Sequence, residues 1–152
     1  MRDPVRMAVC RPMIRSARTA DIEAMHALRL RVLENALSDP QRVTEDSYRP
    51  YLAKGAAWVA ETESGLAGFA ILDVPGGTVW ALFVVPEAEG KGVGRALHAR
   101  LLEGAAEHGL TRLSLTTAPG TRAERFYTEA GWTRAGIAEA GELSFGMDLA
   151  RR

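Results

Sequence analysis

The most informative stretch of the chain reads LFVVPEAEGKGVGRAL and runs from Leu82 to Leu97. Its first part is apolar and strand-like, and Pro86 ends the strand. Alternating glycines then lead directly into a helix expected from Gly92 to about His108. Glycine lets the backbone turn tightly and approach a ligand with no Cβ in between. The first amides of a helix lack internal partners and, with the helix dipole, attract phosphate oxygens, so this stretch predicts an anion site.

Other glycine-rich motifs compete for the same residues. A Walker loop needs four residues between its first glycine and Gly-Lys-Ser/Thr, and this spacing is absent. A dinucleotide fingerprint needs G-x-G-x-x-G after the first strand of a βαβ unit, whereas Gly90, Gly92 and Gly94 give G-x-G-x-G after the fourth expected strand. Taken alone, the three glycines are also compatible with a turn that binds nothing.

Hydrophobic periodicity and turn residues predict the elements on both sides of this stretch. Strands are expected at 13–18, 57–61, 66–73, 78–85, 113–115, 132–137 and 143–149, and helices at 19–34, 44–54, 92–108 and 122–130. The order β-α-α-β-β-β-α-β-α-β-β predicts a single α/β (α+β) domain with a mixed, mostly antiparallel central sheet flanked by helices. We expect this domain to span 13–150 and to follow a leader at 1–12.

Composition excludes several classes of function. The 19 basic residues are balanced by 19 acidic ones, so no overall field favours nucleic acid or an anionic membrane, and neither is expected as a partner. Cys10 is the only cysteine, and His26, His98 and His108 lack ligand spacing, so no metal site is predicted. With no secretory signal and no apolar run near the roughly 20 residues of a membrane helix, a cytoplasmic protein is expected.

A second motif, TTAPGTRAERFYTEAGW, runs from Thr116 to Trp132. It resembles the final part of the general N-acetyltransferase (GNAT) superfamily, in which an aromatic pair on a short helix precedes a Gly-aromatic step. The residues from Glu89 to Gly94 are similar to that superfamily's acetyl-CoA motif, Gln/Arg-x-x-Gly-x-Gly/Ala. The two motifs lie about thirty residues apart, the separation that a helix and a strand require. The resemblance covers nearly the whole chain, from about Met13 to Leu149.

The resemblance implies acetyl-CoA as co-substrate, without a metal. Backbone groups near three residues of the fourth strand would bind the pantetheine arm, the glycine loop would bind the pyrophosphate, and an aromatic side chain would line the cleft. These cofactor-binding residues are Phe83, Val84, Val85, Glu89, Gly90, Lys91, Gly92, Val93, Gly94, Arg95 and Phe126. The chain departs from the superfamily pattern at Glu89, which replaces Gln or Arg and is expected to point outward, and at Gly120, where many relatives carry Asn.

The implied reaction is direct transfer of the acetyl group to a primary amine of a small molecule, in a ternary complex. Tyr127 would protonate the leaving thiol, and a backbone amide of Phe83 or Val84 would stabilise the oxyanion. The alternative for Tyr127 is a core aromatic. No general base is evident, because the residues from Thr78 to Ala81 lack the carboxylate that several relatives carry there, and water is an equal alternative.

The acceptor is expected to contact the first two helices and their connection. Its predicted ligands are Arg29, Glu34, Asn35, Ser38 and Trp80, although core packing is the alternative for Trp80. Two other functions stay open: acetylation of protein N-termini or lysines, and a catalytically silent acyl-CoA-binding regulatory module. Because the final strands often form dimer contacts in this superfamily, a homodimer is also expected.

Overall fold

The computed structural model describes residues 13–33, 43–137 and 141–149. The described strands form one seven-stranded sheet in the order β1-β2-β3-β4-β5-β7-β6. In sequence they are β1 Met13–Ser16, β2 Ala57–Thr62, β3 Gly65–Asp73, β4 Thr78–Val84, β5 Arg112–Thr117, β6 Thr133–Ile137 and β7 Leu143–Asp148. The expected fold class and element order are thus confirmed, while the expected leader at 1–12 lies outside the described residues.

The helices and 3-10 turns lie between these strands. They are η1 Thr19–Asp21, α2 Ile22–Leu33, η3 Glu45–Tyr48, α3 Arg49–Ala53, η4 Pro86–Ala88, α4 Val93–Glu107 and α5 Arg122–Glu129. The single helix expected at 44–54 is wrong in detail, because the segment divides into η3 and the short α3. Pro50 lies in the first turn of α3, where a residue without an N–H is tolerated, and this position marks where the α-helix begins. None of the helices in the described ranges combines the length and hydropathy that a membrane span requires.

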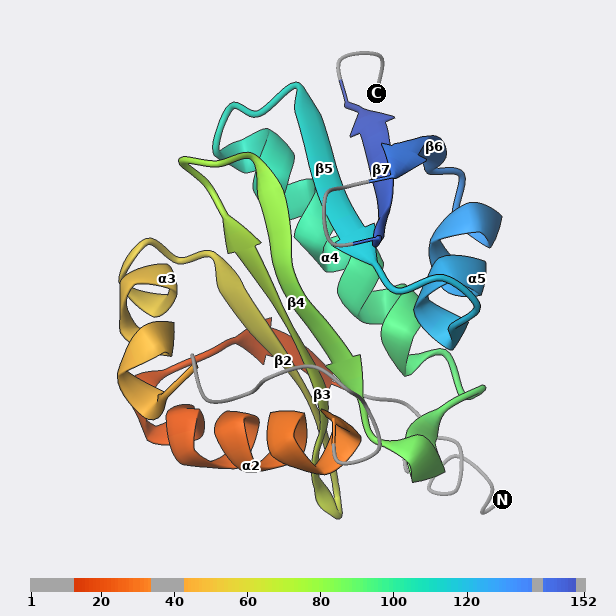
Figure 1. Ribbon diagram of the computed structural model, residues 1–152. Coiled ribbons are helices and arrows are strands. Elements are labelled where there is room, and N and C mark those ends of the chain that lie inside the picture. Colours follow the sequence, from red (N-terminus) through yellow and green to blue (C-terminus); the bar gives the residue numbers. More distant parts are fainter. Residues whose placement is uncertain (1–12, 34–42, 138–140, 150–152) are drawn as a thin grey trace, which may run out of the picture.

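Helices cover both faces of the sheet, as Figure 1 shows. Two neighbouring residues of β3 identify the faces, because successive residues of a strand point to opposite sides. A Cβ placed on Gly68 would lie 3.0 Å from Leu97 of α4. The ring of Phe69 instead contacts Tyr48 of η3 edge-on, with centroids 6.1 Å apart. The apolar core is therefore divided between an α4 layer and an α2–α3 layer.

Strands β4 and β5 meet at one end and then separate. β4 is antiparallel to β3 along its length, but its parallel pairing with β5 consists of the single register pair Thr78 and Ser114. The backbone N–H of Ser114 donates to the carbonyl oxygen of Gly77 at 3.0 Å, which anchors this end. Figure 1 shows the two strands diverging from there. Much of the β4 edge that faces β5 consequently has no strand partner.

A β-bulge lies close to that anchor. In the pairing with β3, Ile71 is opposite Ala81 and Leu72 is opposite Val79, so Trp80 is the extra residue. A bulge bends its strand and redirects the side chains next to it. Trp80 thus lies at a bend of β4, close to the point where β4 and β5 begin to separate.

Helix α4 packs closely on β2 at Gly104, and this contact gives a stability prediction. A Cβ on Gly104 would lie 2.3 Å from Cη2 of Trp58. We expect Gly104→Ala to lower the free energy of unfolding by about 1 to 3 kcal/mol, the usual cost of overpacking, despite the better helix propensity of alanine. Denaturant titration measures the change. The matched control is Gly94→Ala in the same helix, where the nearest atoms would be 3.6 Å away and stability should hold. Equal stability of the two variants would contradict the predicted clash.

Candidate active site

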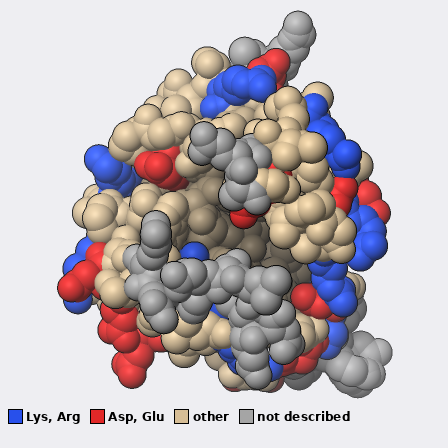
Figure 2. Space-filling model, viewed as in Figure 1, with Lys and Arg blue, Asp and Glu red and all other residues tan. Residues whose placement is uncertain are grey.

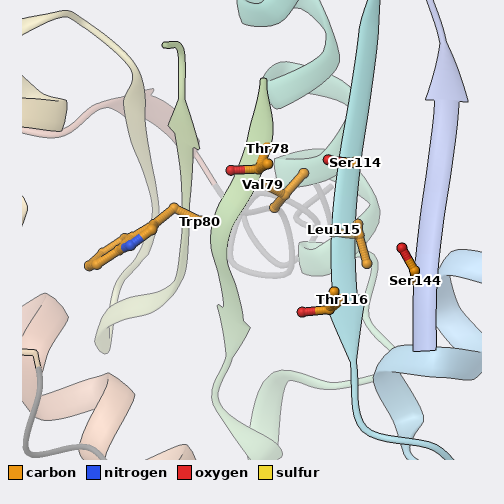
Figure 3. Close-up of a pocket in the computed structure, with 7 residues that line it drawn as sticks. All are labelled: Thr78, Val79, Trp80, Ser114, Leu115, Thr116 and Ser144. Atoms are coloured by element: carbon orange, nitrogen blue, oxygen red, sulfur yellow. The ribbon is translucent and has the colours of Figure 1, made fainter. Parts of the chain in front are cut away.

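The separation of β4 and β5 opens a cavity of about 250 Å³. It is lined by Thr78, Val79 and Trp80 from β4, by Ser114, Leu115 and Thr116 from β5, and by Ser144 from β7. Figure 3 shows these side chains around the gap, with the indole of Trp80 directed away from β5. Figure 2 shows this face of the molecule hollowed near its middle. A ligand placed here would have β4 on one side and β5 on the other.

The backbone of β4 divides into groups that are already bonded and groups that face the gap. Val85 donates its N–H to the carbonyl oxygen of Ala67 at 2.9 Å, and its own carbonyl oxygen accepts from Ala88 at 3.0 Å. Because hydrogen-bonding direction alternates along a strand, Phe83 faces β3 in the same way as Val85. Leu82 and Val84 therefore direct their backbone groups to the open edge. Val85, which the sequence placed among the groups for the pantetheine arm, has no free N–H.

The loop between β4 and α4 has the backbone conformation that its glycines suggested. Gly90 and Gly92 adopt φ values of +80° and +87°, in the left-handed region that favours glycine, with open space where a Cβ would be. The first hydrogen bond of α4 runs from the N–H of Ala96 to the carbonyl oxygen of Gly92 at 3.0 Å. Within the described ranges no acceptor is found for the N–H groups of Gly90, Gly92, Val93, Gly94 or Arg95, whereas that of Lys91 donates to Ala88 at 3.4 Å. A set of donors is thus available to an anion.

Both acidic side chains of this loop are paired with arginines. The carboxylate of Glu89 lies 3.0 Å from the guanidinium of Arg122 at the start of α5. Glu87 pairs with Arg31 of α2, and this contact lowers the pKa of the Glu87 carboxyl below its usual value. The pairings offset much of the repulsion that unpaired carboxylates would exert on a phosphate group.

Helix α5 is fixed at its start by Gly120 and Thr121. The Oγ1 atom of Thr121 accepts from the N–H of Glu124 at 3.2 Å, which is a normal helix cap. The Glu124 carboxylate in turn accepts from the N–H of Gly120 at 2.6 Å. Gly120 has a φ of +75°, a conformation that glycine adopts without strain and that asparagine tolerates better than most residues. This backbone geometry accounts for glycine at a position where many relatives carry asparagine.

Tyr127 of α5 lies in an aromatic cluster and is only 5% exposed. Its ring contacts those of Phe126, Trp132, His98 and Phe145 at centroid distances of 5.1 to 6.5 Å. Burial raises the pKa of Tyr127 well above its usual value, because the surroundings disfavour the charged phenolate. The phenol is protonated at physiological pH, and its raised pKa makes it a weaker acid than an exposed tyrosine.

Phe126, the other half of the aromatic pair, faces the start of α4. A Cβ on Gly94 would lie 3.6 Å from the Phe126 ring and 3.6 Å from Val84. Phe126 is partly exposed, in contrast to Tyr127. The glycine loop, the end of β4 and α5 therefore meet at one place.

A buried hydrogen bond links α4 to the residue that precedes β6. The indole Nε1 of Trp132 donates to Nε2 of His98 at 2.9 Å. We expect Trp132→Phe to lose this bond together with ring volume. Trp58→Phe is the comparison, because the indole N–H of Trp58 is buried without a partner, so this variant loses ring volume and part of the contact with Arg100 but no hydrogen bond. In urea unfolding, Trp132→Phe should be the more destabilised by about 1 kcal/mol, the net contribution of one hydrogen bond. An equal loss in both variants would contradict this prediction.

The acceptor residues expected from the sequence are described only in part. The guanidinium carbon of Arg29 lies 5.2 Å from the ring centroid of Trp80 and 5.0 Å from that of Phe83. The structure thus brings Arg29 of α2 and Trp80 together beside the cavity. Glu34, Asn35 and Ser38 lie outside the described residues.

Three further side chains at this place were not singled out from the sequence. Tyr51 of α3 stacks on Trp80 with centroids 4.6 Å apart, and Tyr48 meets the same ring edge-on at 5.6 Å. The Tyr48 hydroxyl lies 2.9 Å from Nδ1 of His26. The spacing of the two tyrosines was the available signal, because residues three apart share one side of a helical segment.

The described residues contain no group of His, Cys, Asp and Glu side chains suited to a metal ion.

Comparison with known proteins identifies a matching family and a sequence relative. A model of the acetyltransferase (GNAT) family matches residues 22–132 of the chain. The mycothiol acetyltransferase of Sanguibacter keddieii is 37% identical over 98 residues, which make up 58% of this chain and 31% of that protein. The chain thus spans less than a third of the length of this curated relative.

Solved structures share the fold over almost the whole chain. The putative acetyltransferase yncA from Salmonella typhimurium, determined with acetyl-CoA, has a TM-score of 0.75 and 24% identity, covering 91% of this chain and 94% of that chain. The ribosomal-protein-alanine N-acetyltransferase from Brucella melitensis also has a TM-score of 0.75, with 25% identity, and covers 90% of this chain and 99% of that chain.

Proposed function

The chain belongs to the acetyltransferase (GNAT) family, and on this basis we propose that it transfers the acetyl group of acetyl-CoA directly to a primary amine of a small molecule in a ternary complex. One observation carries the proposal. The open edge of β4 leads straight to the unpaired N–H groups at the start of α4, so a linear arm and a diphosphate have adjoining places to bind.

The cofactor would lie along β4. The backbone groups of Leu82 and Val84 bind the pantetheine arm in the manner of an added strand, while Phe83 and Val85 stay bonded to β3. The amides from Gly90 to Arg95 hold the pyrophosphate, with Lys91 and Arg95 adding positive charge and Glu89 held by Arg122. Of the two backbone amides considered for the oxyanion, that of Phe83 faces β3, whereas that of Val84 faces the gap. The N–H of Val84 is therefore the proposed oxyanion donor.

The chemistry needs few side chains. The neutral amine attacks the thioester carbonyl, and the N–H of Val84 stabilises the oxyanion that forms. When the carbon–sulfur bond breaks, Tyr127 protonates the departing thiolate, and water takes the proton from the amine. Much of the acceleration comes from holding the two substrates side by side, as in other bimolecular reactions run within one site.

The size of the cavity supports a small acceptor. Its volume of about 250 Å³ suits a metabolite, and Trp80, one of its lining residues, packs against the guanidinium of Arg29. A thiol-release assay with acetyl-CoA tests this across a panel of small amines and a panel of peptides. Turnover with peptides alone would favour a protein acetyltransferase. Acetyl-CoA binding without turnover on either panel would favour a silent binding module.

The organisation of the whole chain remains a set of predictions: a domain at 13–150, a cytoplasmic location and a homodimer. The outer strand β6 supports the last of these, because all its residues are exposed and Ile137 at its end is 74% exposed. Sedimentation measures the oligomeric state directly.

A further inference from the structure

Among the arginines of the described residues, Arg29 combines buried guanidinium atoms with no ion pair to a described carboxylate. Arg18, Arg95 and Arg125 also have no such ion pair, but they are exposed. Seven others lie within ion-pair distance of a carboxylate: Arg15, Arg31, Arg49, Arg100, Arg112, Arg122 and Arg134. The Nε and Nη1 atoms of Arg29 are buried, yet they have no hydrogen-bond partner. Buried unpaired donors of a charged group are costly, so their presence calls for an explanation.

Packing holds this guanidinium in a fixed position. The rings of Trp80 and Phe83 lie 5.2 and 5.0 Å from its central carbon, and both attract a cation through their faces. Tyr51 stacks on the far side of the Trp80 ring system at 4.6 Å and supports it. The aromatic contacts stabilise the charge but accept no conventional hydrogen bond, so the N–H donors are left for another group.

The polar groups around Arg29 do not neutralise it. The phenol of Tyr48 interacts with the guanidinium of Arg29 by charge and by a side-chain hydrogen bond, and it lies 2.9 Å from Nδ1 of His26. Burial raises the pKa of Tyr48, while the charge of Arg29 and its hydrogen bond to the phenol work against that rise. A neutral phenol leaves the positive charge of Arg29 uncompensated. Within the described part of the chain, the guanidinium of Arg29 therefore lacks a negatively charged partner with oxygen atoms that can accept its hydrogen bonds.

The position of Arg29 connects this deficit to the acceptor. Trp80 lies beside the guanidinium and also lines the cavity between β4 and β5. A group bound by Arg29 would therefore adjoin the proposed reaction site. Guanidinium N–H groups match the two oxygens of a carboxylate, and a preorganised arginine loses little freedom when it binds one.

Resting on the function proposed above, we propose that Arg29 binds a carboxylate of the acceptor, and that the acceptor is an amino acid or another amine bearing a carboxylate near its amino group. The carboxylate completes the hydrogen bonds of Arg29, while the amine is directed toward the thioester. Neutral amines and polyamines would leave the buried charge unpaired and should be poor acceptors.

Matched acceptors test the proposal. The standard amino acids are compared with their carboxamides, which keep the shape but lack the charge. For the preferred amino acid we expect kcat/KM to exceed that of its amide by about 10- to 100-fold, the usual range for a hydrogen bond to a charged group. In Arg29→Met the acid should lose this advantage through KM, the amide should be unchanged, and the KM for acetyl-CoA should hold.

Other outcomes would overturn the proposal. Amides used as well as acids by the wild type, or an equal loss for both in Arg29→Met, would show that Arg29 serves only to pack the helix. Acetylation of peptides in place of free amino acids would also contradict the proposed acceptor. Arg29→Lys serves as a second variant in case Arg29→Met fails to fold. It keeps the positive charge but not the paired N–H donors of the guanidinium, so its preference for the acid over the amide should be intermediate.

A binding measurement separates this proposal from the proposed function. Calorimetry on the protein with CoA compares an N-acetyl amino acid with its amide, and needs no turnover. Tighter binding of the acid, lost in the Arg29 variants, supports carboxylate recognition even when every acceptor fails to react. Failure of acetyl-CoA itself to bind would instead refute the proposed function.

Discussion

Tyr127→Phe is expected to lower kcat by about 10² to 10³-fold while acetyl-CoA affinity holds. The phenol is the proposed proton donor to the leaving thiolate, and general acid catalysis usually contributes a factor in this range. The wild-type phenol carries its proton at neutral pH, as tyrosines ordinarily do, and burial raises its pKa further. Phenylalanine keeps the ring and its contacts with Phe126 and Trp132 but has no proton to give. Steady-state kinetics measures the change in kcat, and calorimetry measures the affinity for acetyl-CoA.

Tyr51→Phe is the matched control. It removes the same hydroxyl from a ring that stacks on Trp80, away from the α5 cluster. Its turnover should stay within a few-fold of the wild type. Unchanged turnover in Tyr127→Phe would remove Tyr127 from the mechanism and leave it as part of the aromatic core.

Gly92→Ala is expected to weaken acetyl-CoA binding by about 10²-fold, equivalent to losing one or two hydrogen bonds to a charged group. Gly92 has a φ of +87°, and its Cβ would enter open space at the mouth of the loop. Alanine strains this conformation and shifts the N–H groups that follow it. Because these N–H groups are the proposed diphosphate ligands, affinity should fall more than stability. Calorimetry and thermal unfolding measure the two effects separately.

The control for Gly92→Ala lies at the other end of the same helix. Gly109 has a φ of +81° and likewise has open space where a Cβ would be. Gly109→Ala should therefore cost a similar amount of stability, about 1 to 2 kcal/mol, without affecting acetyl-CoA. Equal affinities of the two variants would mean that the loop does not bind the diphosphate.

The fold was largely predictable because each element carries its own local signal. The turn at Gly65, the proline after β4 and the glycine after α4 mark boundaries through backbone conformation, which depends on a few neighbouring residues. The bulge at Trp80 and the single rung between Thr78 and Ser114 were not predicted. The bulge and this single pair depend on how strands distant in sequence align. The alternation of apolar and polar residues in 78–85 does not specify that alignment.

The candidate site was predictable where it consists of backbone and only partly where it consists of side chains. The glycine pattern led directly to the loop at Gly90 and Gly92. The sequence also placed Arg29 and Trp80 beside the acceptor, but it did not place Tyr48, Tyr51 or His26 around them. That cluster joins three helical segments, so its members become neighbours only through tertiary packing.

The open edge of β4 lies inside a narrow wedge, which restricts how a ligand can reach it. An ordinary exposed edge can recruit a strand from another protein and so risks aggregation. A foreign strand brings side chains on both of its faces, and here α2 packs on one face of β4 while α4 packs on the other. The wedge that narrows to Thr78 and Ser114 therefore offers this edge to a chain in the plane of the sheet, between the two helical layers. A ligand that binds these backbone groups must therefore reach them from the open side of the wedge.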